Sequence, residues 1–145
     1  MKPSEGDGSM ARISPEKYRD ILSGLELENI SLREVRARLD REALEGPLVV
    51  RSDAKAEYSR DGEQVTVLNT YTVSANARNR KDPAVHIEAT YELLFTSKRS
   101  FTVGFFNVYK KLNLHLHLWP FMRELVNSIT ARMGVSAMTL PLLKT

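Results

Sequence analysis

Hydrophobic and polar positions alternate along three segments in the middle of the chain, and this alternation predicts three half-buried strands. In the first segment, charged residues separate Val50, Ala54, Ala56 and Tyr58. The next two segments carry longer apolar rows: Val65, Val67, Tyr71, Val73, Ala75 and Ala77, then Val85, Ile87, Ala89, Tyr91, Leu93 and Phe95. Because successive side chains of a strand point to opposite faces, each row lines one buried face. Asp61-Gly62 and the segment 79–83 supply the turns.

The segment before these strands is also strand-like but less regular. Its apolar residues change parity twice, at Leu25 and Leu27, then Ile30 and Leu32, then Val35, Ala37 and Leu39. Each change of parity requires a bulge or a break, so we expect an irregular first strand that bends near Asn29 and near Arg33. Ahead of it, Ser14-Pro15-Glu16 has the features of a helix start and predicts a short helix near 15–23 that Gly24 can end.

The C-terminal third, 103–133, is predicted to be helical and to cover one face of the sheet. Its apolar residues recur at helical spacing: Phe105, Phe106, Tyr109 and Leu112, then Leu118, Phe121, Met122, Leu125, Ile129 and Met133. Alternation of leucine and histidine over 114–118 leaves a strand as the local alternative. Pro120 either kinks a continuous helix or marks the first turn of a new one. We favour two helical pieces that meet between Asn113 and Trp119.

The resulting fold class is α+β, with a four-stranded antiparallel meander followed by the C-terminal helical region. Short turns join antiparallel neighbours, whereas parallel pairs need long crossovers. The apolar stripe is wider than one small sheet can bury, and Trp119, Phe106, Val126 and Met133 are expected to leave apolar surface bare in a monomer. We therefore expect a homo-oligomer. Its predicted interface residues are Phe105, Tyr109, Leu118, Phe121, Met122 and Leu125.

Composition and length indicate the number of domains and the cellular compartment to expect. The chain has 145 residues, which suits one domain, and no cysteine. Residues 1–9 are interpreted as a disordered lead or an expression-tag remnant, with Met10 as the natural start and 10–145 as the single domain. There is no apolar run of membrane-spanning length and no signal-peptide pattern, so we expect a cytoplasmic protein.

A net charge of +3 raises nucleic-acid binding as an alternative function. The only dense basic group is Arg33, Arg36, Arg38 and Arg41, with Glu34 and Asp40 among them. A nucleic-acid footprint calls for a clustered basic face interleaved with aromatic residues. The pattern therefore favours a solvated strand face, with a small basic nucleic-acid-binding or regulatory module as the alternative.

Residues that could perform catalysis or bind a metal are few. His115 and His117 lie two apart, which is far apart around a helix, and no third ligand is placed beside them. Glu88, Glu92 and His86 share one polar parity and would more simply solvate that face than act as acid and base. We predict no metal site, no cofactor and no enzymatic activity.

The string Leu118-Trp119-Pro120-Phe121-Met122-Arg123-Glu124 resembles the Leu-Phe-Pro-Tyr-Ala-Arg-Glu signature of the SecB family of bacterial export chaperones. In that family the signature lies in the main helix after a four-stranded antiparallel sheet, and a short apolar segment follows; Thr139-Leu140-Pro141-Leu142 stands in that place here. The resemblance implies an ATP-independent holdase for unfolded polypeptides. It also implies that subunits pair through their sheets and stack through this helix as a tetramer, a dimer of dimers.

For such a chaperone, the candidate client contacts are exposed apolar residues. They are Leu48, Val49 and Val50, then Trp119, and in the tail Val135, Met138, Leu140 and Leu142. SecB chains are usually acidic, which serves docking on the export motor SecA, whereas this chain is basic, so SecA is a weaker expectation. This chain also stops soon after the helix, as do shortened members that serve toxin–antitoxin systems. The expected client is therefore a preprotein or an antitoxin.

Overall fold

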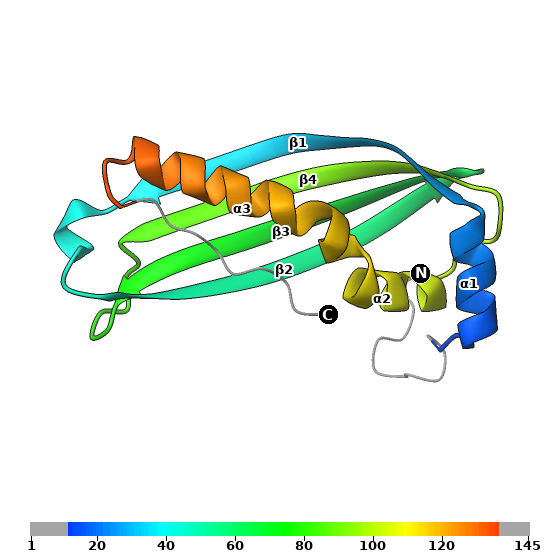
Figure 1. The fold of residues 1–145 in the computed structure, drawn as a ribbon, viewed down its shortest axis with the longest axis horizontal. Coiled ribbons are helices and arrows are strands. Elements are labelled where there is room, and N and C mark those ends of the chain that lie inside the picture. Colours follow the sequence, from blue (N-terminus) through cyan, green and yellow to red (C-terminus); the bar gives the residue numbers. More distant parts are fainter. Residues whose placement is uncertain (1–11, 137–145) are drawn as a thin grey trace.

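The computed structural model describes residues 12–136 and has a four-stranded antiparallel sheet with helices on one face (Figure 1). The helices and strands are α1 Pro15–Ser23, β1 Leu25–Leu39, the 3-10 turn η1 Arg41–Ala43, β2 Leu48–Asp61, β3 Gln64–Ala77, β4 Val85–Ser97, α2 Val103–Leu112 and α3 Leu114–Arg132. The predicted α+β class, the four strands and the helical C-terminal third are confirmed.

The order of strands in the sheet is β1-β4-β3-β2. The meander is confirmed for β2 to β4 but is wrong for β1, which pairs with β4 instead of β2. The connection 40–47 therefore runs from one side of the sheet to the other; Asp40 N–H donates to the carbonyl of Ala84, and the connection contains η1 and Gly46 at a φ of 64°. Among the described strands, β1 and β2 are consequently the two edges of the sheet.

Both predicted irregularities of β1 are confirmed. Its pairing with β4 shifts register between Leu27 and Asn29 and again between Leu32 and Glu34. Because each shift inserts one residue, the apolar side chains that follow return to the helix-facing side. Ile30 then pairs with Leu93 and Val35 with Ala89.

The predicted first helix and the break in the C-terminal helices are also confirmed. Ser14 caps α1 by accepting from the N–H of Lys17 at 3.1 Å, and Gly24 follows the last residue. The break lies at Asn113, whose side-chain oxygen accepts a hydrogen bond from Tyr18 OH in α1. The competing strand over 114–118 is wrong, since α3 begins at Leu114. Pro120 lies inside α3 and does not begin it.

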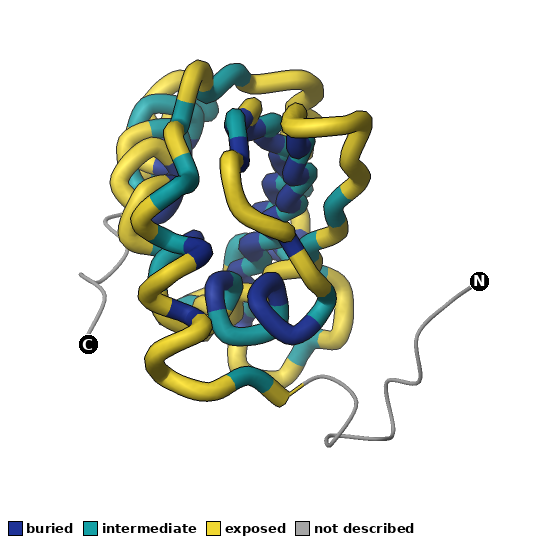
Figure 2. The backbone as a smooth tube through the Cα atoms, turned by 90° about the vertical axis from the view of Figure 1, so that its right-hand side faces the viewer, coloured by how far each residue is buried: buried dark blue, intermediate teal, exposed yellow. Residues whose placement is uncertain are grey.

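The core lies between the sheet and the helical layer, where the buried positions gather inside an exposed outer wall (Figure 2). The expectation of bare apolar surface at Phe106, Trp119 and Val126 is wrong, because these side chains are only 4%, 8% and 0% exposed. The broad stripe is accommodated because both α2 and α3 pack on the inner rows of β3 and β4. The large apolar residues that α2 and α3 leave exposed are Leu112, Leu116 and Phe121.

Candidate functional site

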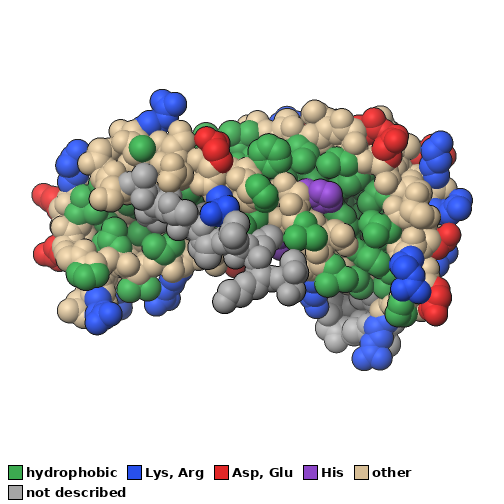
Figure 3. Space-filling model, in the orientation of Figure 1, with side chains coloured by type: hydrophobic (Ala, Val, Ile, Leu, Met, Phe, Trp, Pro, Cys, Tyr) green, Lys and Arg blue, Asp and Glu red, His purple; other side chains and the backbone are tan. Residues whose placement is uncertain are grey.

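The helical layer leaves parts of both edge strands uncovered on its own side of the sheet. Figure 1 shows α3 crossing the sheet obliquely, with its C-terminal end toward β1 and the start of β2 clear of it. Looking onto the same face, Figure 3 shows hydrophobic side chains at the surface in several patches. Two such apolar surfaces, one beside each edge strand, form the candidate site.

The first surface, here called the β1 flank, consists of Leu32, Val35 and Phe121. Their exposed fractions are 44%, 42% and 49%, although Leu32 and Val35 occupy helix-facing positions of β1. Leu32 pairs with Tyr91, and the Tyr91 ring lies 6.3 Å from the ring of Phe121. The strand and the helix thus place two exposed apolar side chains on either side of one aromatic ring.

The second surface, here called the β2 flank, is the helix-facing row of β2 from Leu48 to Ala56. Leu48 and Val50 pair with the buried Ala77 and Ala75, and Val50 is 45% exposed. Val49 pairs with Asn76, a residue of the opposite face. The predicted client contacts Leu48, Val49 and Val50 are therefore divided between the two faces, as strand alternation requires.

A hollow of about 240 Å³ opens in the β2 flank beside the junction of α2 and α3. It is lined by Ala54, Lys55, Ala56, Asn69, Lys110 and His115. The His115 Nδ1 is 2.7 Å from Tyr71 OH, and the Lys110 ammonium lies 5.4 Å from the centre of the Phe106 ring. Asn69 is fully buried, and within residues 12–136 neither its side-chain oxygen nor its nitrogen has a hydrogen-bond partner.

Desolvation shifts the pKa values of two histidines of α3 and of two tyrosines of the sheet. Desolvation lowers the pKa of His115 and of His117 below 6.5, which keeps both imidazoles neutral at pH 7. Desolvation likewise raises the pKa of Tyr71, and it raises the pKa of Tyr91 to about 12 with help from Glu124. Both phenols therefore keep their protons at pH 7.

The edge strands add main-chain hydrogen-bonding groups to the apolar side chains. A strand at the edge of a sheet has N–H and C=O groups along its outer side that can pair with another extended segment. Within the described part of the chain, β1 and β2 each have one such side. Each flank thus combines apolar contact with a strand edge, which suits an extended polypeptide.

Most of the predicted interface residues lie inside the protomer. Phe105, Tyr109, Leu118 and Met122 are at most 1% exposed, whereas Phe121 is half-exposed and Leu125 is partly buried. Among the predicted client contacts, Trp119 is buried with its ring 5.4 Å from that of Tyr71, and Val135 is partly buried. Met138, Leu140 and Leu142 lie outside the described residues. The surface of α3 open to a partner is thus centred on Phe121.

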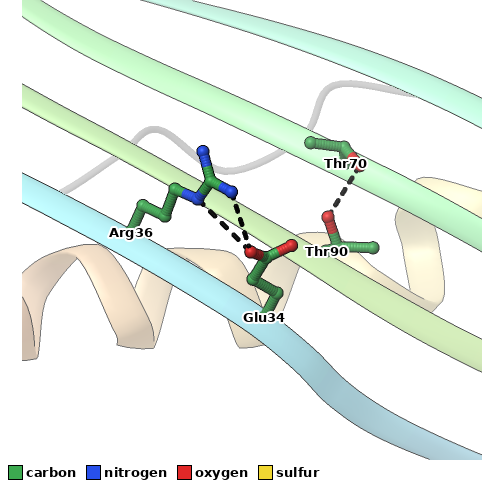
Figure 4. A network of polar contacts seen from close by, with 4 residues as sticks. All are labelled: Glu34, Arg36, Thr70 and Thr90. Atoms are coloured by element: carbon green, nitrogen blue, oxygen red, sulfur yellow. Dashed lines mark hydrogen bonds and ion pairs between the residues drawn. The ribbon is translucent and has the colours of Figure 1, made fainter.

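The opposite face of the sheet is polar. Its central contact is a hydrogen bond of 2.8 Å between Thr70 and Thr90, and Arg36 lies 3.2 Å from Glu34 beside it (Figure 4). Arg33 forms a further ion pair of 2.8 Å with Glu92. Carboxylates thus accompany two arginines of the basic group, which lowers the positive potential that phosphate binding would need.

Neither a metal site nor a membrane-crossing helix is found in residues 12–136. No three His, Cys, Asp or Glu side chains lie close enough together to hold an ion. No helix in this range is long and apolar enough to cross a bilayer. His115 and His117 make separate contacts, the first with Tyr71 and the second with the ring of Tyr109 at 6.3 Å.

Comparison with solved structures finds a protein of similar architecture. The SecB-like chaperone Rv1957 of Mycobacterium tuberculosis, solved in complex with a ChAD peptide from the Rv1956 HigA1 antitoxin, superposes with a TM-score of 0.71. The alignment covers 86% of this chain and 94% of the other, at 14% identity. The chain has a SecB-like fold. The resemblance that the signature string suggested is thereby supported at the level of architecture.

Sequence comparison adds no closer relationship. No family model matches the chain, and no curated protein matches it in sequence. A protein of unknown function from Streptococcus agalactiae gives a TM-score of 0.42 at 10% identity, over 81% of this chain and 97% of its own. The SecB-like fold is thus carried by a divergent sequence.

Proposed function

We propose that this chain is an ATP-independent holdase chaperone of the cytoplasm that binds unfolded polypeptides along its β1 and β2 flanks. The observation that carries the proposal is the exposure of Leu32, Val35, Val50 and Phe121 beside two strand edges. Apolar burial contributes about 25 cal/mol per Å² without regard to sequence order. Main-chain pairing at an edge is equally independent of client sequence. Together they suit the holding of many extended chains.

The class of client is an antitoxin or a preprotein. The SecB-like neighbour was solved with an antitoxin peptide, which supports an antitoxin as the first client to test. The preprotein remains the second candidate because the signature string of α3 is shared with an export chaperone. Fluorescence anisotropy with a labelled antitoxin peptide and with a labelled preprotein peptide compares the two classes. The preferred client class should have the lower dissociation constant.

We further propose that the working form is a homo-oligomer, a dimer or a dimer of dimers. Exposed Leu112 and Leu116 give the end of α2 and the start of α3 an apolar outer surface that belongs to neither flank. A second copy would bury this surface and leave both flanks open to clients. Multi-angle light scattering at micromolar concentration should give a multiple of 16.5 kDa, and a monomer mass would contradict assembly.

The holdase is tested by suppression of aggregation. A chemically denatured protein is diluted into buffer with and without this chain, in the absence of nucleotide, and light scattering is followed. Scattering should fall in proportion to the chain added, with a stoichiometric end point. Unchanged scattering at a several-fold excess would overturn the proposal.

A further inference from the structure

The polar face of the sheet carries charges of opposite sign at its two ends. Residues that pair in register form rows across this face. A row near η1 consists of Arg38, His86, Ser74 and Arg51. A row near α1 consists of Glu26, Thr96, Gln64 and Asp61. Each edge strand thus has an arginine at one end and a carboxylate at the other, so the face is complementary to a copy of itself turned end for end.

One two-fold arrangement of two copies brings these opposite charges together. Its axis lies between the two polar faces, perpendicular to the strands and halfway between Leu68 and Thr70, so that each strand stacks on its own counterpart in the reverse direction. Arg38 then faces Glu26 of the second copy, and Arg51 faces Asp61 of the second copy. Close to the axis, Lys55 faces Glu57 of the second copy. Symmetry makes each of these contacts occur twice.

Other two-fold arrangements of the same faces bring like charges together. If the axis moves by half a row, Lys55 faces Lys55 of the second copy in one direction, and Glu57 faces Glu57 in the other. An axis parallel to the strands stacks β1 on β2 and sets Arg38 on Arg51. Like charges that face each other across an interface destabilise it. The charges of the polar face therefore favour one register.

The charges that meet in this register have no competing partner in their own copy. All six are exposed, and within residues 12–136 none of them forms an ion pair: Arg38, Arg51, Lys55, Glu26, Glu57 and Asp61. Each can therefore pair with a second copy without first breaking an existing ion pair.

The shape and the size of the polar face agree with such a contact. A hollow of about 270 Å³ at its centre is lined by Glu34, Arg36, Thr70, Glu88 and Thr90 (Figure 4). In the same register Leu94, which is 37% exposed, lies at the rim of the second copy's hollow beside Glu88. Four strands of about 14 residues offer roughly 850 Å² per copy, which is close to the roughly 800 Å² of a stable interface.

We infer that the polar face of the sheet is an interface between two copies of this chain, stacked with β1 on β1 and β2 on β2 in reverse direction. This inference rests on the proposed homo-oligomer and adds a second contact to the surface of Leu112 and Leu116. A dimer of dimers needs two unlike interfaces, and these two surfaces provide them. The β1 and β2 flanks lie on the helical face and stay open to clients.

Charge reversal at the two ends of β1 tests the register. Arg38→Glu and Glu26→Arg each create two contacts between like charges, and the double variant restores both pairs with their signs exchanged. Arg38 and Glu26 lie at opposite ends of one strand, so only a second copy can bring them together. In sedimentation equilibrium at low salt, each single variant should raise the dissociation constant of the oligomer about 10-fold, because each exposed pair occurs twice. The double variant should return to the wild-type value.

The matched control is Arg19→Glu, which makes the same change of charge at an exposed position of α1. It should associate as the wild type does. Raising the salt concentration from about 50 to 500 mM should weaken the polar contact, because salt screens exposed charges. Single variants that associate like the wild type, or a double variant that stays as weak as the singles, would overturn this interface. A wild type that is monomeric at every concentration would instead defeat the homo-oligomer itself.

Discussion

Trp119 and Phe121 lie two residues apart in α3 but have opposite environments. Trp119 is 8% exposed with its ring against Tyr71, whereas Phe121 is 49% exposed beside Tyr91. Trp119→Ala should therefore lower the free energy of unfolding by about 3–5 kcal/mol, as expected for loss of a buried aromatic side chain. Urea denaturation followed by far-ultraviolet circular dichroism measures this change. A loss of assembly without a loss of stability would show that the indole contacts a partner instead.

Phe121→Ala is the matched surface substitution for the same helix. Its half-exposed ring should contribute about 1 kcal/mol or less to the stability of the protomer. If Phe121 belongs to a binding surface, this variant should weaken oligomerisation or client holding while its unfolding midpoint stays close to that of the wild type. Sedimentation velocity and aggregation suppression are the measurements. If oligomerisation and aggregation suppression are both unchanged in this variant, the β1 flank is not part of the binding surface.

Two partly desolvated histidines of α3, His115 and His117, make stability depend on pH. Burial lowers the pKa of His115 and His117 in the folded state below the unfolded value of 6.5, so the unfolded chain binds more protons between the two values. The contribution of both groups is fully present above pH 6.5 and is lost as pH falls from there through the folded pKa values. Urea midpoints between pH 8 and pH 5 should therefore decline on the acid side. His115→Gln should make that decline shallower, and an identical profile would contradict the assignment.

The sequence predicts correctly which face of a strand a side chain occupies, because the spacing of residues alone decides this. It does not predict how far a side chain is buried when burial depends on neighbouring elements. Alternation fixed the inner rows of β3 and β4, yet it also contained the signal for Asn69, a polar residue on the apolar parity of its strand. Alternation equally required that Val49 and Val50 face opposite sides. The burial of Trp119 could not be predicted from alternation, because it depends on how far two separate helices cover the sheet.

At the scale of elements, the parity changes of β1 predicted its two bulges, since a row of apolar side chains can stay on one face only by inserting a residue. The start of α1 after Ser14 and its end at Gly24 were likewise predicted from local chemistry, whereas the break between α2 and α3 was predicted only to lie between Asn113 and Trp119. The place of β1 beside β4 could not be predicted in this way. Its pairs run from Leu39 with Val85 to Leu25 with Ser97, and residues so far apart in the chain leave no mark on local periodicity. That order matters for function, since it makes β2 an edge.

The β2–β3 hairpin depends on a glycine. Gly62 adopts a φ of 63°, a conformation that L side chains enter at a cost of about 1–2 kcal/mol. Gly62→Ala should lower the unfolding free energy by about 1 kcal/mol, with Glu63→Ala in the same turn as a control of little effect. Thermal denaturation measures both. Equal midpoints for the two variants would show that the turn relaxes to a different type.

At the scale of the whole molecule, the two faces of the sheet differ in what they can bind. The helical face has the apolar flanks, whereas the polar face has arginines paired with carboxylates. Client binding through apolar contact should hold or strengthen between about 50 and 500 mM salt, because salt does not screen it. Binding to phosphates would weaken steeply over the same range. Anisotropy with an unfolded protein and with a nucleic-acid duplex separates them, and a steep loss for the protein probe would refute apolar holding.

The last prediction concerns the segment 135–145, where Val135, Met138, Leu140 and Leu142 are predicted client contacts. The described core extends from α1 to Met133, and Gly134 turns the chain after α3 at a φ of 78°. A segment of this length can extend over roughly 36 Å at 3.3 Å per residue, more than the roughly 28 Å length of α3 at 1.5 Å per residue. It is therefore long enough to extend along the whole length of α3.

Deleting 135–145 should abolish aggregation suppression while the circular dichroism spectrum stays near that of the full chain, because a short terminal segment contributes little to a core made by residues before it. Replacing the apolar residues Val135, Met138, Leu140 and Leu142 with serine is the matched control, since it keeps the length. It should lose holding to the same extent if apolar contact is what the segment supplies. If the truncated protein still prevents aggregation, clients bind to the flanks alone. If it no longer folds, the segment is part of the core.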